Sequence, residues 1–300
     1  MGLPESARLL ADLVAVPSPT RHEADAARML ADRLPRFGWS GSHLDGAGSV
    51  VAERGTGDKE LVLLSHIDTV PGGPEVMISD EVIRGRGSVD AKGPCCAMAV
   101  AGGAVPVPEG WRITFVAAVG EEIDSKGARF RMPLHSPEAC VIGEPTGSDG
   151  VAISYRGRIL FDIKGEDDGA HRSGSPGPIT DSVMAASSII DITRNMGKGY
   201  SVAIMEMEGH EAGKRSASIT MDLRTPLGAD QEELELMIRE TSAAFGVRSE
   251  IIEYVPPYGV HKSDPVIRAF RNAIRDCGGT PRVLAKQGTC DFNVLSPWGC

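Results

Sequence analysis

Residues 61–71 read LVLLSHIDTVP, a short apolar run that ends in polar and turn-forming residues. Its apolar part has the composition of a strand buried in a sheet that helices cover on both faces. Three more runs rich in Val, Ile or Ala have the same character, namely Ser49–Ala52, Ile113–Val119 and Cys140–Ile142. Apolar residues at helical spacing precede these runs in Pro4–Val16 and Glu23–Leu34. The first half of the chain therefore predicts an α/β fold.

The sequence changes character near Gly150, where polar and apolar residues begin to alternate as they do in half-exposed antiparallel strands. The expected strands are Arg158–Lys164 and Ser216–Arg224, and the expected helices are Ile179–Arg194 and Asp230–Phe245. A helix, a strand and a helix start then follow at Asp264–Arg275, Arg282–Ala285 and Thr289. We expect one α/β domain in two parts, residues 1–149 and 258–300, interrupted by a smaller α+β domain over residues 150–257.

Composition narrows the class of protein. The chain has 300 residues, 41% of them apolar, and a formal net charge of −10. Such an acidic chain lacks the basic footprint of nucleic-acid-binding proteins, and no apolar run reaches the ~20 residues of a membrane-spanning helix. The six cysteines form neither a disulfide framework nor a CxxC pair. We expect a cytoplasmic protein with reduced thiols, and neither nucleic acid nor a membrane as partner.

Polar side chains follow the buried strands. His66 and Asp68 stand where the first quoted strand opens into a loop, so the imidazole can bind a metal while the carboxylate orients it. A loop histidine with a turn-forming aspartate is the plainer reading of this pair alone. Asp90, in GRGSVDAKG, precedes a run of small residues at Cys95–Ala101. By itself it predicts a helix N-cap, although its two oxygens can also bridge two cations.

Glu121 and Glu122 leave the strand Ile113–Val119 together. Carboxylates beside a buried strand are costly unless they are paired or bound to metal. If one of them binds a metal, its neighbour is within reach of a water that the metal activates, as a general base must be. A solvated acidic loop is the alternative reading of this pair taken alone.

Glu144 ends a fourth buried strand, in IGEPT. Four strand ends thus carry His66, Asp90, Glu122 and Glu144. In open α/β sheets the ligand crevice lies at the carboxyl ends of the strands. Histidine mixed with carboxylates is a ligand set that suits zinc or a similar divalent metal. The conjunction predicts a metal-dependent hydrolytic site.

The chain resembles the di-zinc family of aminoacylase, acetylornithine deacetylase and succinyl-diaminopimelate desuccinylase in the segments SHIDTVP, GRGSVDAKG, GEEIDSKG, IGEPT and GTCDFN. The resemblance implies a catalytic domain with a central mixed sheet and an inserted lid or dimerisation domain. It implies two divalent ions, zinc or cobalt, and a homodimer. It also implies site roles: His66 binds the first metal, Asp90 bridges both, Glu122 and Glu144 each complete one site, Asp68 orients His66, and Glu121 is the general base.

The same resemblance assigns residues of the inserted domain and the segment after it. His171, in GAHRS, would reach the transition-state oxygen, and Arg224 would grip a substrate carboxylate or else pair with Asp222. Gly288 and Thr289 resemble a backbone turn that faces the substrate, and Asp291 is read equally well as a helix cap. The family carries a last ligand histidine beyond this point, whereas this sequence has no histidine after His261. We therefore expect an incomplete second metal site, either because the chain is truncated relative to the family or because the protein is impaired, unless another group replaces this histidine.

Three segments, HIDTVPGG, GAHRSGSPGP and KQGTCDFNVL, are most similar to those of one branch of the family. The enzymes of that branch free lysine or ornithine from a small acidic amino-group carrier protein. There the bond cut joins the side chain of the carrier's terminal glutamate to the α-amino group of the amino acid. Deacetylation of acetylornithine or acetyl-lysine, dipeptide hydrolysis, and binding by an inactive relative are the alternatives. Arginines in 84–86, 129–131 and 156–158 are candidates for steering the carrier, or else a solvated face.

Overall fold

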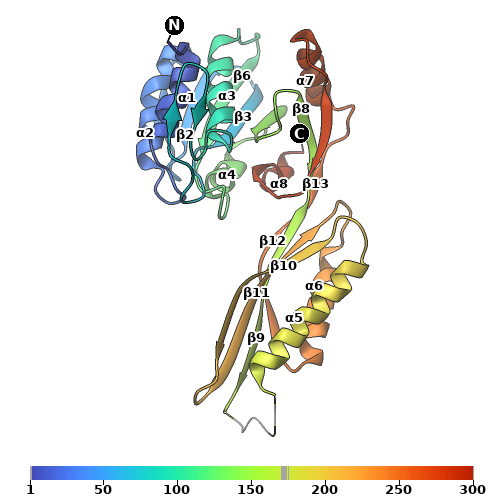
Figure 1. Cartoon of the computed structure of the whole chain (residues 1–300). Coiled ribbons are helices and arrows are strands. Elements are labelled where there is room, and N and C mark those ends of the chain that lie inside the picture. The colour runs from blue at the N-terminus through green and yellow to red at the C-terminus, as the bar shows by residue number, and fades with distance from the viewer. Residues whose placement is uncertain (1, 170–173, 175, 300) are drawn as a thin grey trace. The chain divides into compact units, whose positions relative to one another are not determined.

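The computed structural model describes residues 2–169, 174 and 176–299 (Figure 1). The chain divides into two compact units. The first comprises Met1–Val151, Ser263–Arg282 and Cys290–Cys300, and the second comprises Ala152–Lys262 and Val283–Thr289. None of the helices in the described part of the chain is long and apolar enough to cross a lipid bilayer.

The first unit is built on a mixed five-stranded sheet of order β1-β2-β6-β3-β7. The strands are β1 (Ser42–Leu44), β2 (Val50–Gly55), β3 (Lys59–His66), β6 (Trp111–Ala118) and β7 (Ala139–Gly143). β3 lies between β6 and β7 and runs parallel to both, whereas β1, β2 and β6 pair antiparallel. The central mixed sheet expected from the sequence is confirmed, and the carboxyl ends of its three parallel strands meet at one edge.

Helices cover both faces of this sheet because its strands alternate two apolar sets. On one face Phe115 of β6 packs in a cluster with Leu13 and Leu30, whereas Val116 packs on the other face with Leu64. The helices of this unit are α1 (Glu5–Ala15), α2 (Ala24–Arg33), α3 (Lys92–Ala104), α4 (Lys126–Arg131), α7 (Pro265–Asp276) and α8 (Asp291–Val294). The short 3-10 turns are η1 (Leu34–Phe37), η2 (Met132–Leu134) and η3 (Ser296–Trp298), and a small hairpin joins β4 (Met77–Ile78) to β5 (Ile83–Arg84).

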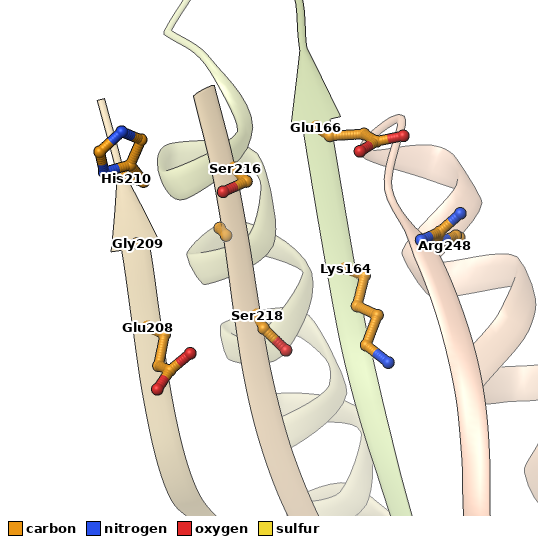
Figure 2. A pocket seen from close by; sticks show the side chains of 9 residues that line it. Lys164, Glu166, Glu208, Gly209, His210, Ser216, Ser218 and Arg248 are labelled. Atoms are coloured by element: carbon orange, nitrogen blue, oxygen red, sulfur yellow. The ribbon is translucent and has the colours of Figure 1, made fainter. Parts of the chain in front are cut away.

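The second unit contains a four-stranded antiparallel sheet of order β10-β11-β9-β12. Its strands are β9 (Gly157–Asp167), β10 (Ser201–His210), β11 (Arg215–Thr225) and β12 (Arg248–Val255), and its helices are α5 (Pro178–Asn195) and α6 (Gln231–Ala244). Alternate residues of β9 and β11, such as Phe161 and Met221, form the core with these helices. The other face is polar and forms a shallow hollow around Lys164 and Ser218 (Figure 2). A further sheet of order β13-β8-β14 is made by β8 (Gly150–Tyr155), β13 (Tyr258–Gly259) and β14 (Arg282–Lys286).

Candidate metal centre

His66 is the last residue of β3 and is buried, with 1% of its surface exposed. Its Nδ1 lies 3.0 Å from the main-chain carbonyl oxygen of Asp68. Because a carbonyl oxygen can only accept a hydrogen bond, Nδ1 of the neutral ring carries the proton. The electron pair is then on Nε2, which lies 3.3 Å from Oδ1 of Asp90. A histidine held in this tautomer is ready to bind a metal through Nε2.

Asp68 is fully buried and holds the loop that carries the two glutamates. Its Oδ1 accepts from the main-chain N–H of Glu121 at 3.0 Å, and its Oδ2 accepts from that of Glu122 at 3.2 Å. The hydroxyl of Thr20 also donates to Oδ2, at 2.8 Å. Burial alone would raise the pKa of Asp68, but the hydrogen bonds and the charge of His66 lower it below its ordinary value. The carboxylate therefore stays charged and fixes this loop.

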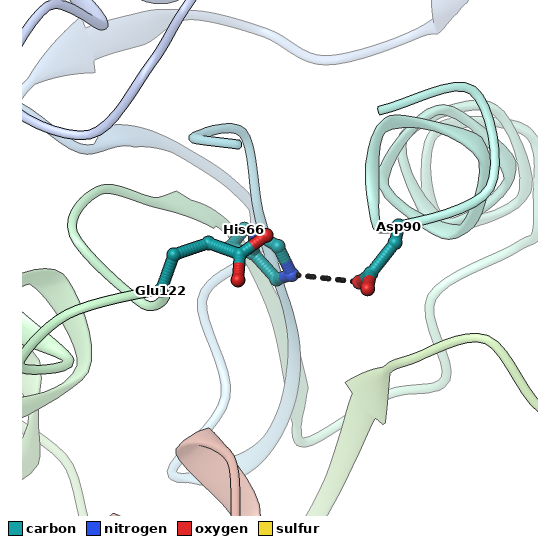
Figure 3. A group of neighbouring side chains, drawn as sticks. All are labelled: His66, Asp90 and Glu122. Atoms are coloured by element: carbon teal, nitrogen blue, oxygen red, sulfur yellow. Dashed lines mark hydrogen bonds and ion pairs between the residues drawn. The ribbon is translucent and has the colours of Figure 1, made fainter. Parts of the chain in front are cut away.

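His66, Asp90 and Glu122 come together at the carboxyl edge of the sheet. Each offers a ligand atom, and these atoms all lie within 4.8 Å of one another. In Figure 3 the carboxylates of Asp90 and Glu122 both turn toward the ring of His66. The three residues come from different segments, so chain folding alone brings them into one cluster.

The reading of Asp90 as a helix cap is wrong. The N-cap of α3 is Ala91, and no side chain makes a capping hydrogen bond there. Instead Lys92, which is 1% exposed, ties the start of α3 to the end of α1, because its Nζ donates to the carbonyl oxygens of Leu13 and Val16 at 3.0 and 2.8 Å. The carboxylate of Asp90 faces His66.

Glu121 and Glu144 also lie near the ring of His66. A carboxylate oxygen of each is 4.0 Å from Nε2 of His66, and their side chains are 11% and 12% exposed. Glu122 is more open, and its Oε1 accepts from the main-chain N–H of Val70 at 3.3 Å. The four expected ligands and the expected base therefore all gather around one imidazole.

The carboxylates of this cluster raise one another's pKa values. The pKa of Glu121 is raised to about 9, first by burial and then by the negative charges of Asp291, Glu144 and Glu122. Burial would lower the pKa of His66, but Asp68 and Asp90 raise it well above its ordinary value. A site with this excess of negative charge is one that divalent cations would stabilise.

Asp291 belongs to this cluster, which its position in the sequence did not reveal. Its reading as a helix cap is wrong, because the N-cap of α8 is Cys290, whose side chain accepts from the main-chain N–H of Asn293. Asp291 is 1% exposed, and neither carboxylate oxygen has a regular hydrogen bond within the described residues. Burial raises its pKa to about 6, although Ser125 lies near enough to lower it somewhat.

The expected substrate residues of the second unit lie beside each other. Arg224 donates from Nη1 to the hydroxyl of Thr289 at 2.8 Å and from Nη2 to Oδ2 of Asp222 at 2.9 Å. Thus the pairing with Asp222, left open by the sequence, is present. Gly288 adjoins Thr289 and has open space where a Cβ would point. His171 lies outside the described residues.

The three arginine-rich stretches are engaged to different degrees. Arg131 is 7% exposed and faces His135 and Asp45 inside the first unit. In the second unit Arg158 pairs with Asp222 and Glu253. These two guanidinium groups serve the fold and are poor candidates for contact with a partner.

Comparison with known proteins agrees with this geometry. The model of peptidase family M20/M25/M40 matches residues 62–298, which include every residue of the cluster around His66. The chain belongs to the M20/M25/M40 peptidase family. A LysW-lysine hydrolase of Deinococcus radiodurans is 32% identical over 308 residues, covering 96% of this chain and 84% of that protein.

Two solved structures show the same fold. A tripeptidase of Staphylococcus aureus has a TM-score of 0.77 at 18% identity, covering 99% of this chain and 89% of that one. A dinuclear metal-binding M20 peptidase of Bacillus subtilis has a TM-score of 0.68 at 15% identity, covering 97% and 85%. The expected family and enzyme class, a metal-dependent hydrolase of linear amides, are confirmed.

Proposed function

We propose that this M20 hydrolase cuts the amide bond between a small acidic amino-group carrier protein and lysine or ornithine, in lysine and arginine biosynthesis in the cytoplasm. The observation that carries the chemistry is the cluster of His66 with Asp90 and Glu122, whose ligand atoms lie within 4.8 Å of one another. The relative from Deinococcus radiodurans, which is named a LysW-lysine hydrolase, supports the choice of substrate.

The donor set fits divalent metal ions. Neutral imidazole and carboxylates suit zinc or cobalt, and the excess of negative charge around His66 calls for cations. We assign His66, Asp90, Glu122 and Glu144 as the residues that would hold the metal ions. When bound, such ions polarise the amide carbonyl and offset the negative charge that develops on its oxygen.

Glu121 acts as the proton carrier in this proposal. Its carboxylate lies 4.0 Å from Nε2 of His66, so it borders the space that the ligands surround. It takes a proton from the attacking water and passes it to the nitrogen of the leaving amine. Burial and neighbouring carboxylates raise the pKa of Glu121, which makes it a stronger base. Positive charge at the site lowers this pKa again, toward the neutral pH range.

The other assigned residues hold the reacting groups in place. Asp68 keeps His66 oriented and, through its bonds to Glu121 and Glu122, positions the base and a ligand at once. Arg224, with Gly288 and Thr289, binds a substrate carboxylate, and His171 assists at the carbonyl oxygen. Residues 150–257 act as the lid or dimerisation domain of a homodimer.

Metal analysis combined with one hydrolysis assay tests the proposal. The purified protein is expected to hold zinc or cobalt, one ion firmly and a second more weakly because its site lacks the last histidine, and to release free lysine or ornithine from the aminoacylated carrier. Acetylornithine and acetyl-lysine, assayed in parallel, are expected to be cleaved far more slowly. Faster cleavage of the acetyl compounds would show that they, and not the aminoacylated carrier, are the substrates. Binding of the carrier without metal or turnover would show that the protein is a binding protein and not an enzyme.

A further inference from the structure

Arg86 follows the β4–β5 hairpin and lines two hollows of the first unit. One, of about 340 Å³, has the candidate ligands Asp90 and Glu122 in its wall. The other, of about 300 Å³, is lined mainly by proline and valine side chains. Both hollows share Arg86, Val70 and Pro74 in their walls. The guanidinium group therefore stands at the boundary between the cluster around His66 and a neighbouring apolar depression.

The backbone holds this side chain in place. Nε of Arg86 donates to the carbonyl oxygen of Gly72 at 3.0 Å. A Cβ on Gly73 would lie 2.8 Å from Nε and 2.9 Å from Cβ of Arg86, and Gly73 has a φ of +126°. The absence of a side chain at residue 73 thus lets the arginine lie against the loop. Since only Nε is used in this contact, the two terminal NH2 groups remain available.

Arg86 differs from other arginines of the same unit in its partners. Arg21 lies 2.7 Å from Asp124, and Arg112 lies 3.3 Å from Glu60. For Arg86 no carboxylate of the described residues lies within ion-pair distance, and among the described residues that line the hollow with Asp90 and Glu122 it is the one cation. A held guanidinium group with both terminal nitrogens open is suited to a carboxylate that comes from outside the chain.

We propose that Arg86 binds a carboxylate of the substrate and so orients its amide bond at the cluster. This inference rests on the proposed function, whose substrate carries two carboxylates next to the scissile amide. One is the α-carboxylate of the carrier's terminal glutamate, and the other belongs to the amino acid that leaves. Either would present two oxygens to the terminal nitrogens of Arg86, and the shared chemistry is a carboxylate near the reacting carbonyl.

Equilibrium binding tests the inference without turnover. The probe is γ-glutamyl-lysine, joined through the α-amino group of lysine, titrated by calorimetry into the zinc-loaded Glu121→Gln protein. Adding Arg86→Ala is expected to weaken binding by about tenfold to a hundredfold, the usual worth of a hydrogen-bonded charge pair. Arg86→Lys is expected to recover part of this loss, because an ammonium group keeps the charge but not the planar pair of donors.

Arg84→Ala is the matched control. Arg84 is exposed and lies two residues earlier on the same hairpin, but it lines neither hollow. Its removal takes away the same charge from the same segment, so binding is expected to change by less than about twofold, as for a screened surface charge. An equal loss in both variants would mean general electrostatic attraction and would overturn the specific role of Arg86.

Two truncated probes distinguish the sources of the carboxylate. γ-Aminobutyryl-lysine lacks the carboxylate on the carrier side, and γ-glutamyl-cadaverine lacks the one on the leaving side. Arg86→Ala is expected to have no further effect on whichever probe lacks the partner of Arg86. If the variant weakens no probe, the inference is overturned while the proposed function stands. If the parent protein binds none of the three and wild type hydrolyses none, the proposed substrate is wrong, and the inference falls with it.

Discussion

A histidine lies against acidic side chains at each end of strand β3: His135 faces Glu60 at the start, and His66 at the end faces several carboxylates. At the start of the strand, Oε1 of Glu60 accepts from Nδ1 of His135 at 2.9 Å and from the hydroxyl of Thr114 at 2.6 Å, and Arg112 lies 3.3 Å away. At the other end, His66 faces Asp90, Glu121, Glu122 and Glu144. In the first cluster, the balanced end, Arg112 offsets the charge of Glu60, whereas in the second, the unbalanced end, several carboxylates surround one histidine.

For this reason the pKa of Glu60 and the pKa of Glu121 are shifted in opposite directions. Burial works against the charge of Glu60, yet the hydrogen bonds from His135, Thr114 and Arg112 lower its pKa to about 2. Burial and neighbouring carboxylates raise the pKa of Glu121 to about 9. The direction in which the pKa of a buried ionisable group is shifted is therefore informative about function. The number of buried ionisable groups, taken alone, is not informative.

The largest expected effect separates the two glutamates of the unbalanced end. Glu121→Ala should lower turnover by ~10²- to 10⁴-fold, because a positioned general base contributes about that much, while metal content stays near that of wild type. Glu122→Ala should lose metal as well as activity. Metal analysis and carrier hydrolysis on the two variants check this, and loss of metal in Glu121→Ala alone would show that the two roles are exchanged.

A substitution at the balanced end should act on stability alone. Glu60→Ala removes a carboxylate that is 2% exposed and leaves the buried donors of Thr114 and His135 without their acceptor, which typically costs ~1 to 3 kcal/mol for each donor. Urea unfolding of the metal-loaded protein measures the loss. The folded variant is expected to keep wild-type metal content and turnover. A change in either would mean that the two ends of β3 are coupled and that Glu60 does not act on stability alone.

The pH dependence of stability should differ in sign between the two ends in metal-free protein. The folded pKa of Glu121, about 9, exceeds its ordinary value of 4.5. Its contribution is thus full below pH 4.5 and lost as pH rises through about 9, by up to ~1.4 kcal/mol per pH unit. Glu60, with a pKa of about 2 against 4.5, contributes above pH 4.5 and loses that contribution as pH falls through about 2.

Unfolding in the presence of a chelator, measured across both pH ranges, checks these signs. Glu121→Gln should reduce the loss of stability at alkaline pH and leave the loss at acid pH unchanged. Glu60→Gln should reduce the loss at acid pH and leave the alkaline loss unchanged. Adding zinc to the wild-type protein should remove the alkaline loss as well, because cations offset the crowded carboxylates. An alkaline limb that Glu121→Gln does not alter would assign it to another group.

The sequence predicts the unbalanced end better than it predicts the balanced one. His66 and Glu122 each follow a run of buried apolar residues, and the edge where parallel strands end is where a ligand site forms. Glu144 follows β7, which was expected to be buried but is a half-buried edge strand of the sheet. The central strands and the long helices were predictable for the same reason, since burial leaves a pattern in the residues. β10 was not predicted, because it is an edge strand exposed along most of its length and its residues have little burial to record.

Residues that act through hydrogen bonds across long distances in the chain leave no such pattern. Asp291 begins a short helix, and the sequence fits a cap as well as a site residue. Glu60 and His135 are 75 positions apart, and nothing local to either indicates the other. Thr20 lies in the segment PSPT, and nothing in that segment indicates a contact with the site. In the structure its hydroxyl donates to the carboxylate of Asp68, which also accepts from the main-chain N–H groups of Glu121 and Glu122.

The smallest expected effect tests whether that hydroxyl helps to hold the unbalanced end. Thr20→Val keeps the shape of the side chain but removes the 2.8 Å hydrogen bond to Asp68, which is worth about 1.5 to 3 kcal/mol when the acceptor is charged. Asp68 keeps its main-chain donors, so the loop should loosen without losing metal. We expect kcat to fall several-fold with little change in KM, and Thr20→Ser to restore it. If Thr20→Val lowers the free energy of unfolding but leaves kcat unchanged, Thr20 has only a structural role. A hydroxyl that only supports packing should not affect the turnover step.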